Sequence, residues 1–334
     1  MPALLGTYPT PVEPLAPLSS ERCALWVKRD DRTHPMYGGN KVRKLEILLA
    51  DACARGARRI VTFGTVGSHH VLATALHGRS AGLEVAAILT PQPWSAHACA
   101  NLRAALGAGL QAYPCSRIVR VPVTLARLVR RGDYVMPPGG SSPLGSVGYA
   151  DAVQELRTQV REGRMPMPTE IVVALGSGGT AAGLLAGVVE TGMPVRVVGV
   201  RVVDPPLVTR ASTLLLARAV ARRRSRDVSA RQLANQFDME RGFLGAGYGH
   251  CTPQGAAAIA TAAQLQLQLE PCYTAKAFAA ALVRVASGHA PTVLYWHTLS
   301  SAPMEPLLAA APGESDLAPE LRALLAGHQA RGGA

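Results

Sequence analysis

Short apolar runs and longer helical stripes alternate along the chain. The runs typical of strands lie at residues 24–27, 59–63, 84–89, 171–175 and 195–200. Between them apolar side chains recur with the period of a helix, as in the stripe that runs from Lys41 to near Gly56. Ser68 is placed to cap a helix that continues to Ala81. This alternation predicts βαβ units and an α/β fold with parallel-rich sheets flanked by helices.

The second half of the chain continues the pattern, with helices expected at 148–162 and 180–189. The stretch 205–240 is expected to be helical and basic throughout, and its run Arg222–Arg224 is interpreted as a solvated helix face because no aromatic residues are interleaved with it. Residues 171–189 carry no charge, but the Gly-Ser-Gly-Gly in their middle favours strand, loop and helix over a membrane span.

With 334 residues the chain exceeds one ordinary core, so two domains are expected. The Pro-Pro-Gly-Gly sequence at 137–140 breaks the chain between them. We predict a large domain from residues 1–45 and 151–334, and a small α/β domain from residues 46–150.

Composition and charge narrow the choice of function. Hydrophobic residues make up 48% of the chain, which is enough for a buried core. The net charge of +12 favours anionic partners. Arg supplies 30 of the 34 basic residues, and the lysines are Lys28, Lys41, Lys44 and Lys276. Because an amine forms a Schiff base and a guanidinium does not, these few lysines are candidates for covalent chemistry.

Cysteines and histidines give no metal pattern. The six cysteines include no C-x-x-C pair, which argues against a zinc ribbon and is typical of reduced thiols in the cytoplasm. The amino terminus has no basic region followed by an apolar one, so no signal peptide is expected. His69, His70 and His77 lack a carboxylate or thiol at ligand spacing, so no metal is expected there.

A glycine-rich loop is the clearest chemical signal. It follows an apolar strand, precedes a helix and comprises Gly176, Ser177, Gly178, Gly179 and Thr180. Backbone N–H groups of such a loop converge on an anion at the positive end of the helix, so the loop predicts a phosphate site. The phosphate belongs either to a dinucleotide, with Arg201 near a 2′-phosphate, or to a smaller cofactor held by an amine elsewhere. Lys41 supplies that amine at a loop-to-helix junction, and the two features together suggest pyridoxal 5′-phosphate.

Several motifs in this order resemble one family. They are Gly38-Gly39-Asn40-Lys41-Val42-Arg43-Lys44-Leu45-Glu46, the helix start at Ser68, the glycine loop, Gly247-Tyr248-Gly249 and Cys272-Tyr273-Thr274. The set is similar to the 1-aminocyclopropane-1-carboxylate deaminase and D-cysteine desulfhydrase family, which belongs to the fold-type II, tryptophan synthase β-like pyridoxal phosphate enzymes. The resemblance implies a two-domain homodimer that acts on a small amino acid, with no nucleic-acid or membrane partner.

The resemblance also implies roles for single residues. Lys41 would hold the cofactor as a Schiff base and shuttle the α-proton, with Asn40 supporting its loop. The glycine loop 176–180 would cradle the cofactor phosphate. Ser68 would contact the substrate carboxylate or act on the substrate, and Tyr248 and Tyr273 would face the substrate.

Three differences from the family motifs bear on the reaction. Thr274 stands where the deaminases carry a glutamate that keeps the pyridine nitrogen protonated. A neutral hydroxyl still suffices to expel a good leaving group, so α,β-elimination from D-cysteine or a related amino acid is preferred. His69 replaces an asparagine expected beside the cofactor's phenolic oxygen, and Leu299-Ser300 replaces a pair of glycines.

The alternatives are a 1-aminocyclopropane-1-carboxylate deaminase and a diverged member with altered or lost catalysis and a binding or regulatory role. A third is an NADP-dependent oxidoreductase, which depends on the glycine loop and Arg201 alone.

Overall fold

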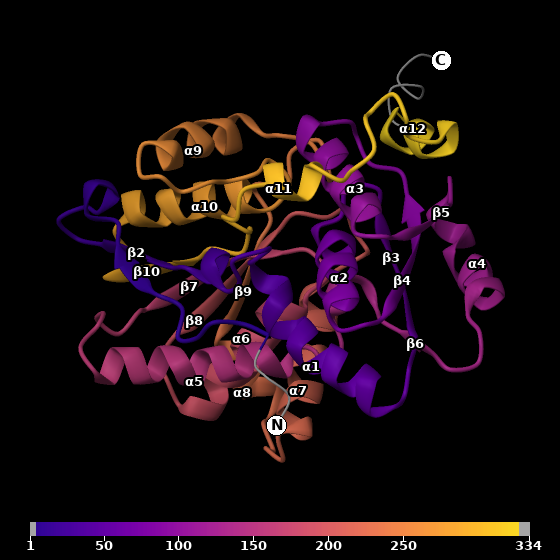
Figure 1. Ribbon diagram of the computed structural model, residues 1–334. Helices are drawn as coiled ribbons and strands as arrows, with labels where there is room; N and C mark the ends of the chain where they lie inside the picture. The colour runs from indigo at the N-terminus through magenta and orange to yellow at the C-terminus, as the bar shows by residue number, and fades with distance from the viewer. Residues whose placement is uncertain (1–4, 327–334) are drawn as a thin grey trace. The chain divides into compact units, whose positions relative to one another are not determined.

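The computed structural model describes residues 5–326, which form two compact units. The larger unit contains residues 5–44 and 141–302, and the smaller contains residues 45–140 and 303–326. Helix α1 (Asn40–Ala54) begins in the larger unit and continues in the smaller one (Figure 1).

These bounds differ from the predicted domains at both edges. Residues 141–150 belong to the larger unit, and the segment after residue 302 belongs to the smaller one. That segment carries α11 (Glu305–Leu308), which packs on α3 (Ala96–Gly107), and α12 (Pro319–Ala326), which packs on β5 (Gln111–Pro114). The Arg103 guanidinium fixes it by donating to the carbonyl of Pro312 over 2.6 Å. The ends of the predicted large domain, at residues 1–4 and 327–334, lie outside the described residues.

A six-stranded sheet forms the centre of the larger unit. Its strands follow the order β1 (Val12–Pro14), β2 (Ala24–Lys28), β10 (Thr292–Trp296), β7 (Glu170–Leu175), β8 (Arg196–Arg201) and β9 (Phe237–Glu240). All neighbours are parallel except β1 and β2. The carboxyl ends of β7 and β10 therefore lie at one edge of the sheet, and there the loops after both strands begin.

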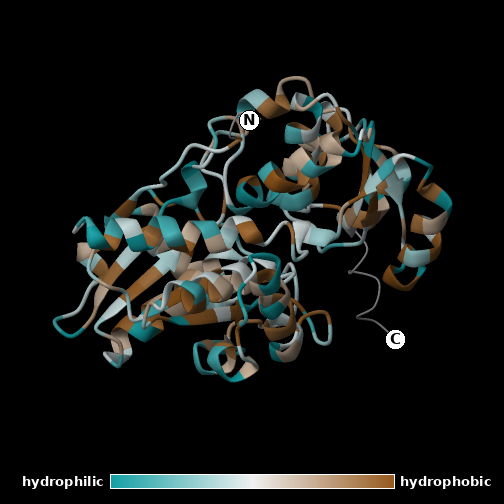
Figure 2. Ribbon diagram, turned by 90° about the horizontal axis from the view of Figure 1, so that it is seen from below, coloured by the Kyte–Doolittle hydropathy of each residue, from teal (hydrophilic) through white to brown (hydrophobic). Residues whose placement is uncertain are grey.

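Helices cover both faces of this sheet (Figure 1). One face is covered by α5 (Val147–Arg161), α6 (Gly179–Thr191), α7 (Arg210–Arg223) and α8 (Ala230–Asn235), and the other by α9 (Pro253–Ala263) and α10 (Thr274–Ser287). On β7, Ile171 and Val173 pack into the first layer and Val172 into the second. Since both faces are buried, the strands are almost continuously apolar, and Figure 2 shows them brown between helices of mixed colour.

The smaller unit contains a parallel sheet with the order β5, β4 (Glu84–Thr90), β3 (Arg59–Thr65) and β6 (Asp133–Val135). Helix α2 (His69–Ser80) packs on β3 and β4, and α4 (Val121–Leu128) contacts β4 within a core of Val61, Ile88 and Leu128. The described helices include none that is both long and apolar enough to cross a membrane.

The prediction of a continuous helical stretch over 205–240 was wrong. The segment contains α7, α8 and the edge strand β9. Thr209 and Ser229 each form a capping box, so each begins a new helix. Phe237 is buried in the core, and its side chain fixes β9 as the last strand beside β8.

Candidate active site

The glycine loop connects β7 to α6, as the sequence predicts. Gly178 is the N-cap of α6 with φ +86°, a conformation that favours glycine, and its position offers no side-chain cap to the helix. A Cβ atom on Gly176 would lie 2.9 Å from Cε1 of Tyr273, so the loop passes close to that ring. The start of α6 therefore presents backbone N–H groups beside glycines, which is the geometry that binds a phosphate.

Ser141 joins this loop to a second amine. Its Oγ accepts a hydrogen bond from the Gly179 N–H at 3.1 Å and lies 2.7 Å from Oγ of Ser177. Nζ of Lys44 donates to the same oxygen at 3.5 Å. Burial, and then the charge of Lys41, hold the pKa of Lys44 well below its ordinary value. A phosphate on the loop would return this amine to its charged form.

Lys41 lies one residue after the contact that joins α1 to the loop. The Asn40 side chain donates to Oγ1 of Thr180 at 3.0 Å, and the Asn40 N–H donates to the carbonyl of Thr298 at 3.0 Å. Burial lowers the pKa of Lys41 to about 8, while the charge of Glu270 acts in the opposite direction. The structure thus brings together the helix start and the glycine loop, which are some 140 residues apart in sequence.

A buried ionic network fixes the first turn of α1. The Arg43 guanidinium donates to Asp30 through Nε at 2.9 Å and Nη2 at 2.8 Å, and to Glu155 through Nη1 at 3.0 Å. Asp30 also accepts from the Tyr149 hydroxyl and from the Trp296 indole. Burial raises the pKa of Asp30, but the Arg43 charge and these donors outweigh it and hold the pKa below its usual range. Asp30 is therefore an anion bound from several sides, and it anchors the helix that carries Lys41.

The two predicted tyrosines form a pair. Their hydroxyl oxygens are 2.7 Å apart, and the rings meet edge to face at 5.6 Å between centroids. Burial, and then Tyr248, raise the pKa of Tyr273 well above its ordinary value, so its hydroxyl stays protonated. Asp204 positions Tyr248 by accepting from its backbone N–H at 3.1 Å. The pair thus places two hydroxyl groups beside the glycine loop.

Thr274 begins α10, and in this structure its hydroxyl bonds to Glu270. It accepts from the Glu270 N–H at 2.8 Å and lies 3.2 Å from Oε1 of the Glu270 carboxylate. That buried carboxylate also accepts from the N–H groups of Cys272, Tyr273 and Thr274 at 2.7–2.8 Å. Glu270 therefore caps α10 and adds a negative charge near Lys41.

Ser68 and His69 lie in the smaller unit at the start of α2. Ser68 is the N-cap and accepts from the Val71 N–H at 3.4 Å. Nε2 of His69 lies 3.0 Å from Nε2 of His97, so one ring donates a hydrogen bond to the other. His70 instead bonds to Thr62 in β3, with 2.9 Å between Nε2 and Oγ1.

Sequence reasoning missed Ser141, Glu270 and His97, and it named Lys44 only as one of four candidate lysines without a role at the phosphate site. Lys44 had a signal, since it is one of four lysines and lies in the same motif as Lys41. Glu270 had one too, because an acidic residue just before a helix is typical of a cap. Ser141 lies in the loop before α5, and His97 lies at the start of α3, 28 residues from His69. Nothing in the local sequence marks either residue.

Comparison with known proteins shows the family. Residues 3–298 match the family described as "Pyridoxal-phosphate dependent enzyme", and the chain belongs to that family. It is 37% identical to nocardicin C-9′ epimerase of Nocardia uniformis subsp. tsuyamanensis, over 89% of this chain and 92% of the relative. It is 34% identical to D-cysteine desulfhydrase of Klebsiella pneumoniae (strain 342), over 83% of this chain and 85% of the relative.

A solved structure titled as an ACC deaminase homologue superimposes with a TM-score of 0.79 at 29% identity, covering 92% of this chain and 95% of that one. These findings confirm the predicted resemblance and the fold-type II architecture. The family match also favours pyridoxal phosphate over the dinucleotide that Arg201 had suggested.

The residues present fit this cofactor. Gly178, with its left-handed backbone, and the N-terminal end of α6 suit its phosphate, and the nearby amine of Lys41 suits its aldehyde.

The glycine loop can be tested by exchanging one glycine. Gly178→Ala forces an L-residue into the left-handed region at a cost of about 1–2 kcal/mol. We expect weaker binding of pyridoxal phosphate, measured as an increased Kd. Gly192→Ala is the matched control, because Gly192 ends the same helix with φ +66° and has open space around its Cβ position. Equal losses of cofactor affinity in the two variants would contradict a phosphate site at Gly178.

The lowered pKa of Lys41 predicts how the rate of cofactor attachment changes with pH. Only a neutral amine attacks an aldehyde. Because the pKa of Lys41 is lowered to about 8, the neutral fraction of this amine increases with pH until the pH reaches about 8. The attachment rate of cofactor-free protein should rise roughly tenfold for each pH unit below 8 and then level off. Free Nα-acetyl-lysine, whose amine has an ordinary pKa, is the control and should keep accelerating. A protein rate that also rises steadily to pH 10 would contradict the lowered pKa.

Proposed function

We propose that this protein uses pyridoxal phosphate to remove the α-proton from a small amino acid and to eliminate its β-substituent, with D-cysteine or a related amino acid as substrate. One observation carries the proposal. The helix start that bears Lys41 is joined to the glycine loop through Asn40 and Thr180 within one compact unit. Elimination from cysteine with uptake of one water gives pyruvate, hydrogen sulfide and ammonia.

The cofactor, when bound, supplies an electron sink that stabilises negative charge at the α-carbon. The Lys41 amine, with its pKa lowered to about 8, accepts the α-proton at Nζ and holds it for return. The loop 176–180 and the Lys44 amine bind the phosphate. Ser68, at the positive end of α2, binds the substrate carboxylate.

Thr274 and the tyrosine pair favour elimination. The Thr274 side chain is neutral, so it does not keep the pyridine nitrogen protonated. Negative charge that develops at the α-carbon is then relieved by the departure of a good leaving group. A thiolate is such a group. Tyr273 keeps its proton because burial and Tyr248 raise its pKa, so the pair can donate a proton to the departing sulfur.

Epimerisation is a second candidate, favoured by the 37% identity to nocardicin C-9′ epimerase over 89% of the chain. It shares the first step, removal of the α-proton, but returns a proton to the opposite face and expels nothing. Ring opening of 1-aminocyclopropane-1-carboxylate is a third reaction, and loss of catalysis is the remaining alternative.

One set of assays separates these reactions. The protein is loaded with pyridoxal phosphate and given D-cysteine, L-cysteine or 1-aminocyclopropane-1-carboxylate in D₂O, with sulfide, 2-oxo acid and substrate configuration measured. Elimination releases sulfide and pyruvate from one enantiomer of cysteine. Inverted, α-deuterated amino acid without sulfide supports epimerisation, and 2-oxobutyrate from the cyclopropane substrate supports the deaminase. A bound cofactor whose absorption spectrum no amino acid changes would overturn catalysis altogether.

The predicted homodimer and the cytoplasmic location remain predictions. Sedimentation of the purified protein tests the first. Fractionation of the source cells tests the second.

A further inference from the structure

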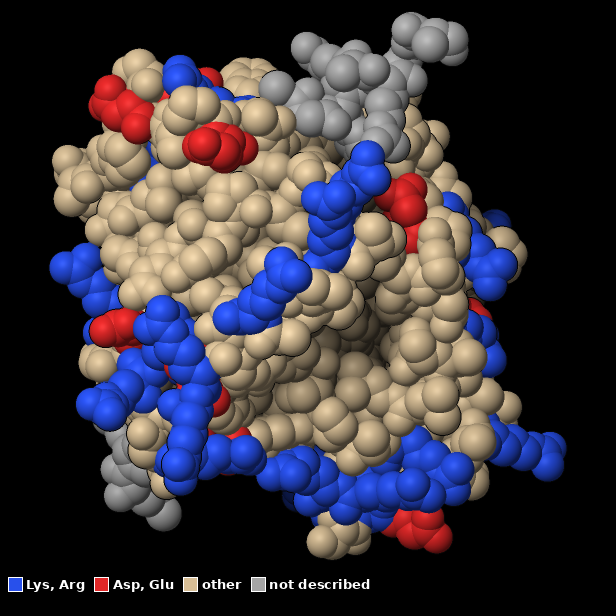
Figure 3. All heavy atoms as spheres, turned by 90° about the vertical axis from the view of Figure 1, so that its right-hand side faces the viewer, with Lys and Arg blue, Asp and Glu red and all other residues tan. Residues whose placement is uncertain are grey.

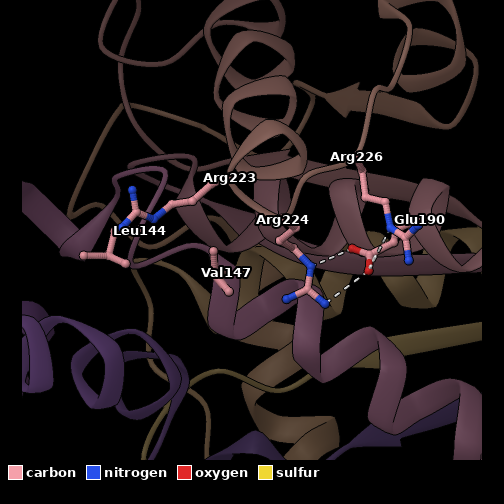
Figure 4. Close-up of a pocket in the computed structure, with 6 residues that line it drawn as sticks. All are labelled: Leu144, Val147, Glu190, Arg223, Arg224 and Arg226. Atoms are coloured by element: carbon pink, nitrogen blue, oxygen red, sulfur yellow. Dashed lines mark hydrogen bonds and ion pairs between the residues drawn. The ribbon is translucent and has the colours of Figure 1, made fainter.

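A surface cavity of about 370 Å³ lies in the larger unit, away from the residues described above. It is lined by Leu144, Val147, Glu190, Arg223, Arg224 and Arg226 (Figure 4). Glu190 lies near the carboxyl end of α6, whereas the glycine loop lies at the amino end of the same helix. A cavity of this size suits a small molecule.

The charges around this arginine cavity do not cancel. Arg224 donates to Glu190 at 2.6 Å through Nε and to Asp151 at 2.6 Å through Nη1, so its charge is compensated. Arg226 approaches the same Glu190 only to 3.8 Å, so this carboxylate is shared. Arg223 extends to the Leu144 side of the cavity, away from Glu190 (Figure 4), and has no ion pair among the described residues. Three guanidinium groups thus face two carboxylates.

The start of helix α5 forms another part of the wall. Val147 is its first residue, and the N-cap Ser146 makes no side-chain hydrogen bond to the helix. The buried Ser146 hydroxyl has no hydrogen-bond partner within the described part of the chain. The backbone N–H groups at this end of α5 already have partners, because Ser146 donates to the Ser142 carbonyl and Val147 donates to that of Leu144.

We propose that the arginine cavity binds a small phosphate-bearing anion at a site separate from the cofactor. Arg223 forms the bidentate contact, since a guanidinium matches two phosphate oxygens. Leu144 and Val147 contact the carbon part of a phosphomonoester. The sequence pattern indicated a solvated helix face for the basic run Arg222–Arg224. The proposal gives one residue of this run, Arg223, a binding function. Figure 3 shows Lys and Arg side chains gathered along the lower edge of one molecular face, and the net charge of +12 attracts anions to the protein as a whole.

Binding of inorganic phosphate to the cofactor-loaded protein tests this proposal by calorimetry at low ionic strength. Loading occupies the glycine loop, so added phosphate reports on other sites. We expect one site, weakened at least about tenfold by Arg223→Gln. Arg222→Gln is the matched control, because Arg222 is the exposed neighbour outside the cavity lining and its loss changes net charge equally.

Four outcomes would overturn the proposal. They are no phosphate binding up to millimolar concentration, equal weakening by the two variants, tighter binding of succinate than of phosphate, and binding of a single-stranded RNA that both variants weaken alike. The last would indicate an extended basic surface rather than a pocket. Because neither side chain is part of the cofactor machinery, turnover of the amino-acid substrate in phosphate-free buffer should be unchanged in both variants, which separates a failure here from a failure of the proposed function.

Discussion

Replacing Lys41 with alanine should abolish covalent attachment of pyridoxal phosphate and lower kcat by about 10³-fold or more. The variant loses both the amine that holds the cofactor and the group that accepts the α-proton. Borohydride reduction followed by peptide mapping measures the attachment directly. The chain has only four lysines, so the labelled peptide identifies the residue without ambiguity.

Two controls separate chemistry from folding. Lys41→Arg keeps a positive charge but cannot bond to the aldehyde, so it should be as inactive as Lys41→Ala. Added methylamine should partly restore turnover to Lys41→Ala by acting as a free base, and should do nothing for Lys41→Arg. A label on Lys28, Lys44 or Lys276, or full turnover by Lys41→Ala, would refute the assignment.

Arg43→Met should be the most destabilising single change in the network behind the site. It leaves the buried Asp30 carboxylate without its ion-pair partner and removes one of the two cations that contact Glu155, the other being Lys28, and breaking a buried pair costs about 3–5 kcal/mol. For units of this size we expect the melting temperature to fall by about 10 °C. Calorimetry of the cofactor-free protein measures the change without contribution from bound ligand.

The exposed pair Arg164–Glu162 provides the comparison. Its side chains are 54% and 46% exposed, so Arg164→Gln should change the free energy of unfolding by no more than about 1 kcal/mol. Arg43→Lys should fall between the two, because an amine keeps the charge but loses the planar fork that binds Asp30 twice. Equal melting temperatures for Arg43→Met and Arg164→Gln would contradict the role given to Arg43.

Local patterns predicted most of the fold. The strands near 24–27, 59–63, 84–89, 171–175 and 195–200 are all present, and so is the helix that Ser68 caps. The pattern failed over 205–240, where an overall helical composition hid two capping boxes and an edge strand. It also could not predict the place of the segment after residue 302. That placement depends on long-range contacts such as the bond from Arg103 to Pro312.

The candidate site divides in the same way. Lys41, the glycine loop and the tyrosines are marked by motifs, because their chemistry needs particular residues in a particular local geometry. Ser141 and His97 are not marked, because they act only through partners distant in sequence. For Thr274 the residue was foreseen but its bond to Glu270 was not, since the cap forms only when the chain turns at Pro271.

Among residues 5–326, each compact unit is assembled from two stretches of chain separated by the other unit's sequence. During synthesis the amino-terminal strands lack the rest of the larger unit until residues after 141 have been translated. The smaller unit lacks its last segment until residues from 303 onward have been translated. At ordinary translation speeds that second wait lasts on the order of ten seconds or longer. Nascent chains of this protein should therefore depend on chaperones more than their size alone would suggest.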